Sequence, residues 1–131
     1  MLADLDALHE AMTALPLVFA HGDCHTGNVL HAGRSLVFCD WQSAGAARAQ
    51  SDLAFLSVRA TPSGGARSGA LIDAYLARSA DDPQLLRRAV VADELTTLLV
   101  HWPPYAPAND AAGIARIVHR MRALTDLWLT T

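Results

Sequence analysis

The sequence predicts a mainly α-helical domain of the α+β class, with helices dominating a small β component. Apolar residues recur every three or four positions in several segments, as they do on one face of an α-helix. A short hairpin pattern with a glycine at its turn lies between the first two of these segments. The chain has 131 residues, 52% of them hydrophobic and 18% charged, which is enough apolar material for one buried core. We therefore expect residues 1–131 to form a single domain.

The first part of the chain contains one helical stripe and three short apolar runs. The stripe covers residues 2–15, and Pro16 is expected to end the helix because proline cannot continue the hydrogen-bond ladder. The runs at residues 29–30 and 36–39 flank a turn at Gly33 and predict a β-hairpin. The runs at residues 17–20 and 36–39 are also expected to be buried, so that the polar residues between them lie on a turn between core segments. The three runs are 17–20, 29–30 and 36–39.

The middle of the chain alternates between breakers and helices. Residues 43–50 are small and rich in alanine and glycine, which is typical of a loop close to bound phosphates or of a linker into the next helix. Ser51 is a candidate N-cap for a helix that runs through Val58. Residues 61–69 contain a proline and three glycines, so this stretch is expected to break the helix and to be mobile.

Three further helices are predicted in the second half of the chain. Apolar residues mark a short one over residues 71–76. Asp82 followed by proline is typical of a capped start, and the helix that begins there is expected to continue to a pair of prolines at 103–104. Asn109 or Asp110 can cap the last helix. Its apolar stripe consists of Ile114, Ile117, Val118, Met121, Leu124 and Trp128.

Charge and composition exclude several classes of partner. The net charge of -3 gives no basic face for nucleic acid and no polybasic segment for an anionic membrane. No stretch of about twenty apolar residues predicts a membrane span. Asp4 and Asp6 stand where a secretory signal would carry positive charge, which favours a cytoplasmic protein. Cys24 and Cys39 lack CxxC spacing and are expected to be reduced thiols.

The polar residues between the apolar runs have the spacing of a phosphoryl-transfer loop. Asp23 is followed five residues later by Asn28, and Asp40 comes just after the hairpin. Phosphoryl transfer needs a carboxylate that orients the attacking hydroxyl and hard oxygen ligands that hold Mg²⁺ against nucleotide phosphates. The hairpin would return Asp40 to the side of Asn28, so that both could bind one ion.

Three motifs in order resemble a known family. Residues 21–28 read H-G-D-x-H-x-x-N, residues 38–42 read F-C-D-W-Q, and Gly45 is followed by the run Ser-Asp-Leu-Ala at 51–54. Together they are similar to the aminoglycoside phosphotransferase family, which shares the protein-kinase-like fold with choline kinases. The resemblance implies the helical C-terminal lobe of that fold, with the hairpin carrying the catalytic and metal-binding loops.

The resemblance also implies roles for individual residues. Asp23 would be the catalytic base, and Asn28 and Asp40 would be Mg²⁺ ligands beside the phosphates of ATP or GTP. His25 would shape the loop and would be counted, with Asn28 and Asp40, among the cofactor-binding residues. The acceptor would be a hydroxyl group of a small molecule.

Two more residues would support the loop. The resemblance implies that the Asp52 carboxylate accepts hydrogen bonds from the loop backbone. For His21 we expect a packed ring that is hydrogen-bonded to backbone, rather than a proton shuttle.

Members of this family also have an N-terminal lobe whose strand-borne lysine contacts the nucleotide. The present chain begins with a predicted helix and contains no lysine, since arginine supplies all ten Lys+Arg residues. We therefore expect the C-terminal lobe only, with the N-terminal nucleotide-clamping lobe absent. The partner would then be the missing N-terminal lobe or a second chain.

Two alternatives stay open at this point. The first is a non-catalytic or partner-dependent lobe, which would show an exposed apolar patch beside the loop. The second is a metal-dependent phosphoester hydrolase, prompted by Gly22, Asp23 and His25, with His25 then a metal ligand.

The acidic pair Asp93 and Glu94 has two readings. With Trp102 and Tyr105 it could form a wall for a polycationic aminoglycoside, but a solvated helix face and a packed helix end are favoured. The arginines of the last helix are expected to face solvent. They are Arg116, Arg120 and Arg122.

Overall fold

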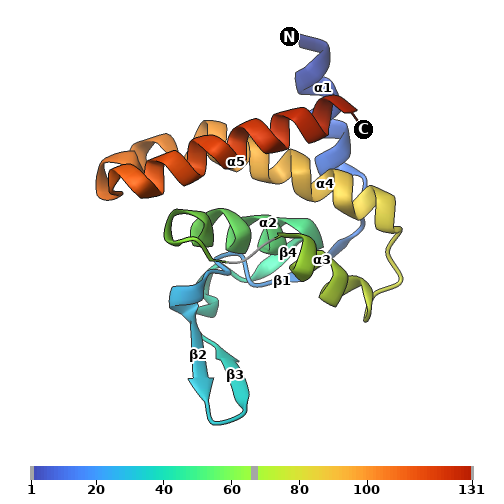
Figure 1. Ribbon diagram of the computed structural model, residues 1–131. Coiled ribbons are helices and arrows are strands. Elements are labelled where there is room, and N and C mark those ends of the chain that lie inside the picture. The colour runs from blue at the N-terminus through green and yellow to red at the C-terminus, as the bar shows by residue number, and fades with distance from the viewer. Residues whose placement is uncertain (1, 66–67, 131) are drawn as a thin grey trace.

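The computed structural model describes residues 2–65 and 68–130 and shows a helical body from which a β-hairpin projects (Figure 1). The helices are α1 (Leu2–Thr13), α2 (Ala49–Ala60), α3 (Ser68–Leu76), α4 (Pro83–Thr96) and α5 (Ala111–Thr130). The strands are β1 (Leu17–Ala20), β2 (Val29–Ala32), β3 (Ser35–Phe38) and β4 (Gly45–Arg48). The predicted fold class, mainly helical with a small β component, is confirmed.

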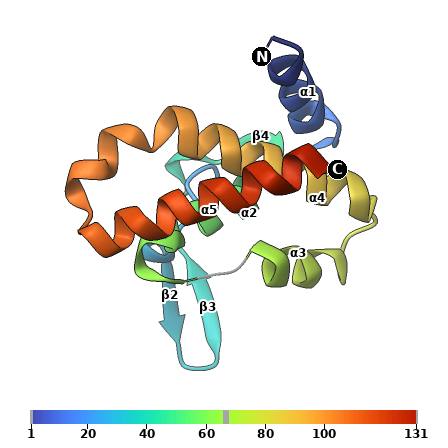
Figure 2. The same ribbon diagram turned by 45° about the horizontal axis from the view of Figure 1, so that its top comes forward.

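Helix α4 is the centre of the helical body and packs against α1, α2 and α5 (Figures 1 and 2). Leu86 and Ala89 are fully buried on it, and Val90 is 1% exposed. One cluster of core side chains joins α4 to α2 and α3, and a second joins it to α2 and α5. Of the predicted stripe on α5, Ile117 and Leu124 are buried in this core and Met121 and Trp128 pack against it, whereas Ile114 and Val118 are exposed.

The four strands form two separate antiparallel pairs. Strand β2 pairs with β3 in the predicted hairpin, and Gly33 occupies its turn with a φ of 62°. Strand β1 pairs with β4, with Leu17 opposite Arg48 and Ala20 opposite Gly45. Sequence analysis missed β4 and assigned its residues to a loop or linker, because a run of glycine and alanine carries little strand propensity of its own.

The expected burial of the first and third apolar runs is wrong. Phe19 in β1 is 74% exposed and Leu36 in β3 is 58% exposed, while Ala20 is buried. Each sheet has only two strands, and helix α2, which contacts β1 and β4, leaves Phe19 uncovered. Phe19 stacks on Trp41 with ring centroids 6.1 Å apart, so the exposed side chains form a surface of their own.

Two predicted helix starts are confirmed, and other predicted helix ends differ from the structure. Asp82 caps α4 by accepting hydrogen bonds from the N–H groups of residues 84 and 85 at 2.9 Å. Asp110 caps α5 through the Gly113 N–H. Ser51 does not cap α2, since β4 carries the chain directly into a helix that begins at Ala49. Helix α1 ends at Thr13, two residues before the predicted end.

The long helix predicted from residue 82 to the proline pair changes character before it ends. After Thr96 it widens into a π-helix over Thr97–His101, and a 3₁₀ helix over Pro103–Ala108 replaces the expected loop. The mobility expected for residues 61–69 falls partly on Ala66 and Arg67, which lie outside the described residues; Thr61–Ser63 form a 3₁₀ turn.

The expected solvated face at Asp93 and Glu94 is also wrong. Glu94 is fully buried, and its Oε2 accepts hydrogen bonds from Nε and Nη2 of Arg120 at 2.9 and 2.6 Å. Arg120 also donates to the Ser68 hydroxyl, so one guanidinium ties α4, α5 and α3 together. Burial raises the pKa of Glu94, and the charge of Arg120 opposes that rise.

Within the part of the chain that the structure describes, no helix has both the length and the apolar character needed to cross a membrane.

Candidate functional site

The polar loop at residues 21–28 connects β1 to β2 and is fastened to the start of α2. The Asp52 carboxylate, in the first turn of that helix, accepts hydrogen bonds from the N–H of His21 at 2.7 Å and of Gly22 at 3.0 Å. Gly22 has a φ of +80°, and a Cβ there would lie 2.2 Å from the backbone oxygen of Ser43. Only glycine therefore allows the loop to pass this close to the segment before β4.

His21 links the loop to the end of the hairpin. Its ring is 5% exposed, its Nε2 lies 2.8 Å from the carbonyl oxygen of Cys39, and its Nδ1 accepts the Asp23 N–H at 3.3 Å. A carbonyl can only accept, so Nε2 carries the proton and Nδ1 is the acceptor. The ring packs 4.5 Å from that of Trp41, between centroids.

Asp23 and Asn28 are in direct contact. The Asn28 Nδ2 donates to the backbone oxygen of Asp23 at 3.0 Å and to its carboxylate Oδ2 at 3.1 Å. Both donors of the amide thus face Asp23, which leaves the Asn28 Oδ1 available to a cation.

His25 shapes the turn that makes this contact possible. Its Nδ1 accepts the Gly27 N–H at 3.1 Å, which caps the short 3₁₀ turn at Thr26–Asn28. The other ring nitrogen lies 3.7 Å from the Asp23 carboxylate, and the ring contacts Phe55 of α2 edge-on. The His25 side chain therefore connects the loop to α2.

The hairpin returns the chain from Asn28 to Asp40. Phe38 pairs with Val29, and the Cys39 N–H donates to the Asn28 carbonyl at 2.8 Å, so Asp40 is the next residue along. It adopts a left-handed conformation with φ 63° and ψ 60°, and no other non-glycine residue in the described ranges has a positive φ. Such a conformation costs about 1 kcal/mol for an L-residue.

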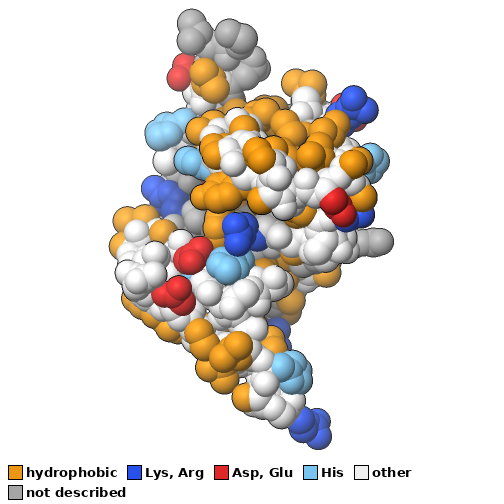
Figure 3. All heavy atoms as spheres, turned by 90° about the vertical axis from the view of Figure 1, so that its left-hand side faces the viewer, with side chains coloured by type: hydrophobic (Ala, Val, Ile, Leu, Met, Phe, Trp, Pro, Cys, Tyr) orange, Lys and Arg blue, Asp and Glu red, His pale blue; other side chains and the backbone are white. Residues whose placement is uncertain are grey.

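The oxygens of this loop suit a hard cation. The Asp40 carboxylate is exposed and has no hydrogen-bond or ion-pair partner among residues 2–65 and 68–130, and the Asn28 Oδ1 is likewise available. Mg²⁺ is commonly held by one or two protein oxygens together with phosphates and water. The same ranges contain no group of three or more His, Cys, Asp or Glu side chains that could hold a metal. Figure 3 shows acidic side chains next to a histidine and an arginine, above the apolar surface of the hairpin.

Cys24 lies inside the loop and is buried. Burial raises the pKa of its thiol, and the nearby carboxylates of Asp52 and Asp23 raise it further. The thiol is thus kept protonated, which agrees with the expected structural role and gives it no nucleophilic character.

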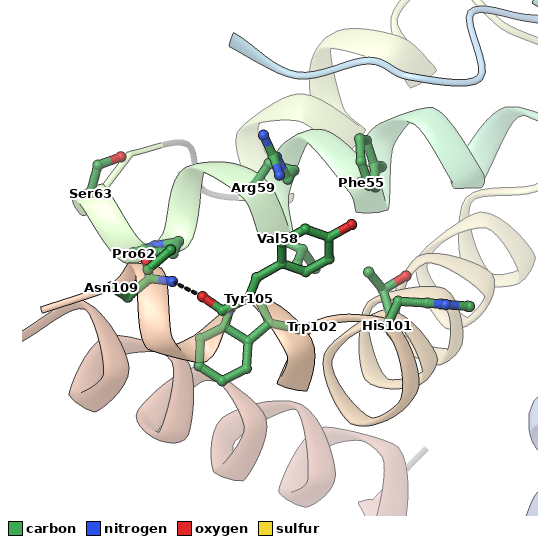
Figure 4. Close-up of a pocket in the computed structure, with 11 residues that line it drawn as sticks. Phe55, Val58, Arg59, Pro62, Ser63, His101, Trp102, Tyr105 and Asn109 are labelled. Carbon is green, nitrogen blue, oxygen red and sulfur yellow. Dashed lines mark hydrogen bonds between the residues drawn. The ribbon is translucent and has the colours of Figure 1, made fainter. Parts of the chain in front are cut away.

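Sequence analysis missed a cavity of about 550 Å³ beside the loop. It lies between α2 on one side and the π-helical and 3₁₀ segments on the other (Figure 4). Phe55, Val58 and Arg59 face it from α2, and their spacing of three and four residues was the only local signal for it. Trp102 and Tyr105, the aromatic residues of the wall considered for an aminoglycoside, line the cavity. Its acidic residues, Asp93 and Glu94, do not line it. The remaining lining residues include Pro62, Thr97, His101 and Asn109.

Comparisons with known proteins give the family of this chain and a structure of similar fold. The profile of the phosphotransferase enzyme family matches residues 1–89. The structure is similar to that of a choline/ethanolamine kinase family protein from Mesorhizobium loti, with a TM-score of 0.55 and 23% sequence identity. This similarity covers 94% of the present chain and 44% of the other one, so the chain spans less than half the length of that protein. A comparison with curated proteins gave no match.

Proposed function

Because the chain belongs to the phosphotransferase enzyme family, as the resemblance of its three motifs indicated, we propose that it transfers the γ-phosphoryl group of ATP or GTP to a hydroxyl of a small molecule. The observation that carries the proposal is the direct contact of Asn28 with Asp23, on a loop whose backbone is held by Asp52. Phosphoryl transfer depends on such positioning more than on covalent chemistry.

In this proposal Asp23 accepts the proton of the acceptor hydroxyl. The Asn28 amide orients the carboxylate through Oδ2, and Asp52 and His21 fix the backbone on either side. His25, close to the same carboxylate, keeps the turn in shape. The side chain of Asp23 is 36% exposed, so a substrate hydroxyl can reach it.

The Asn28 Oδ1 and the Asp40 carboxylate would hold Mg²⁺. The ion would neutralise charge on the nucleotide phosphates, which is the chemistry it supplies when bound. Asp40 is held in a costly conformation without a partner in the described chain, and binding a cation would account for that. We place the reaction in the cytoplasm, where nucleoside triphosphates are available.

Two measurements test the proposal. The purified chain is incubated with γ-labelled ATP or GTP, Mg²⁺ and a panel of hydroxylated compounds, and label transfer is measured. Asp23→Asn keeps the shape of the loop and removes the proton acceptor, so transfer should fall about 10²- to 10⁴-fold. Unchanged transfer would show that Asp23 is not the base. Titration with Mn²⁺ should show binding that Asp40→Asn weakens.

A second candidate is supported by a specific observation. The surface beside the loop carries exposed apolar side chains, including Phe19 at 74% and Trp41 at 48%, as expected for a lobe that works against a partner. In this reading the chain binds a second lobe or chain there. Sedimentation or crosslinking with Phe19→Ser tests it, and an unchanged association state would count against it.

The hydrolase alternative gains no comparable support. The described ranges show no side-chain cluster with three potential metal ligands, and His25 is engaged with the Gly27 N–H.

A further inference from the structure

Two side-chain contacts join the cavity beside α2 to the loop. Phe55 lines the cavity, and its ring centroid lies 6.2 Å from that of His25. His25 in turn lies 3.7 Å from the Asp23 carboxylate. Asp52 and Phe55 are three residues apart on α2, about 4.5 Å along the axis. Phe55 and His25 therefore connect the wall of the cavity to the Asp23 carboxylate.

The wall opposite α2 is shaped by an uncommon backbone. The Trp102 N–H donates to the Thr97 carbonyl at 2.9 Å, five residues back, which defines the π-turn. Thr97 and His101 both face the cavity from this widened turn. Single π-turns within helices occur frequently at functional sites. This feature is independent of the loop and also indicates a ligand site.

The cavity is lined mainly by flat aromatic rings and other apolar side chains. The rings of Phe55, Trp102 and Tyr105 line it together with Val58 and Pro62. The Tyr105 ring reaches toward α2, with its hydroxyl on the side of Phe55 and His101 (Figure 4). Flat aromatic walls of this kind favour a ligand with a flat apolar body.

The charge of the lining is positive. Arg59 is exposed, its guanidinium lies 5.9 Å from the Phe55 ring centroid, and it has no carboxylate partner within residues 2–65 and 68–130. Among the residues that the structure describes, no Asp or Glu lines the cavity. The nearby acidic groups are engaged elsewhere, Asp93 with the Ser51 hydroxyl and Glu94 with Arg120.

We propose that the acceptor, in the reaction proposed above, is a hydroxylated compound with a planar apolar body and an anionic group that Arg59 binds. A polycation such as an aminoglycoside would meet this arginine with no carboxylate among the described lining residues to balance it. The acidic and aromatic wall considered from the sequence is thus replaced by a basic and aromatic one.

Three probes of the same ring and similar length test the charge preference. They are 4-hydroxyphenylacetate, which is anionic, tyrosol, which is neutral, and tyramine, which is cationic. Binding to the purified chain is measured by calorimetry without nucleotide. The expected order of affinity is anion, neutral compound, cation. A charge-neutralising Arg59→Gln should reduce the preference for the anion about tenfold, and Arg59→Glu should invert the order.

Arg87→Gln is the matched control. Arg87 pairs with Asp73 at the surface and does not line the cavity, so the variant should bind all three probes like the parent chain. Tightest binding of tyramine, binding of none of the probes, or an order unchanged in Arg59→Glu would each overturn the proposal. Asp23→Asn should still bind the anionic probe, so failure of the reaction and failure of this cavity assignment can be told apart.

Discussion

Removing the Asp52 carboxylate should loosen the loop without unfolding the domain. Asp52→Ala deprives two backbone N–H groups, those of His21 and Gly22, of their acceptor. Hydrogen bonds to charged groups contribute about 1.5–3 kcal/mol each. The bond to Gly22 is exposed and the bond to His21 is partly buried, so solvent screening lowers each contribution to about 1–2 kcal/mol, and we expect a loss of about 2–4 kcal/mol.

This loss is smaller than the total stability of a domain of this size, which is about 7–20 kcal/mol at 0.05–0.15 kcal/mol per residue. The variant should therefore fold. Urea denaturation followed by circular dichroism should show a midpoint lowered by about 1–2 M, for a slope near 2 kcal/mol per M. Amide hydrogen exchange should accelerate at His21 and Gly22 more than in the helical core, because those two N–H groups lose their partner.

Two variants make the interpretation specific. Asp52→Asn retains one neutral acceptor and should fall between Asp52→Ala and the parent chain. Asp73→Ala removes an exposed carboxylate from an ion pair with Arg87, whose side chains are 67% and 50% exposed, and should cost less than about 0.5 kcal/mol. If Asp52→Ala proves no more destabilising than Asp73→Ala, the two hydrogen bonds do not hold the loop.

Three further predictions concern the same framework. Gly22→Ala should destabilise the chain by at least about 2 kcal/mol in urea titration, whereas Gly33→Ala, with a positive φ but open space around it, should cost about 1 kcal/mol. Asp40→Gly should raise stability by about 0.5–1 kcal/mol by relieving the left-handed conformation, yet abolish Mn²⁺ binding; equal Mn²⁺ affinity would exclude Asp40 as a ligand. Burial raises the pKa of Glu94 above the ordinary 4.5, so the folded state holds its proton more tightly. The parent chain should therefore lose stability relative to Glu94→Gln as pH rises from about 4.5 through the raised pKa, and pH-dependent thermal unfolding measures this difference.

Local turn chemistry made part of this structure predictable. The caps at Asp82 and Asp110 and the hairpin turn at Gly33 depend on neighbouring residues only, and all three were found where expected. Asp52 and the loop it holds are about thirty residues apart, and no pattern in the sequence alone joined them. The three ordered motifs did so through the family they resemble.

The errors have one physical cause, which is that a sequence pattern does not say what will cover it. The run at 17–20 is apolar enough for a core, but it forms one strand of a two-stranded sheet in which Leu17 and Phe19 stay exposed. Glu94 was expected in solvent because its partner, Arg120, is 26 residues away. The strand at 45–48 exists because β1 supplies its hydrogen bonds and not because of its own composition.

Helix α2 determines the distance between the two candidate sites. Its first turn carries Asp52, which holds the loop, and the next turns carry Phe55 and Arg59, which line the cavity. Its buried face is small, with Ala54 fully buried and Val58 2% exposed against α4 and α5. Small side chains let helices approach closely, so a larger residue at Ala54 would displace α2. Such a displacement would move the loop and the cavity wall together, which means that reactivity at Asp23 and binding at Arg59 should change in the same variant although neither residue is touched.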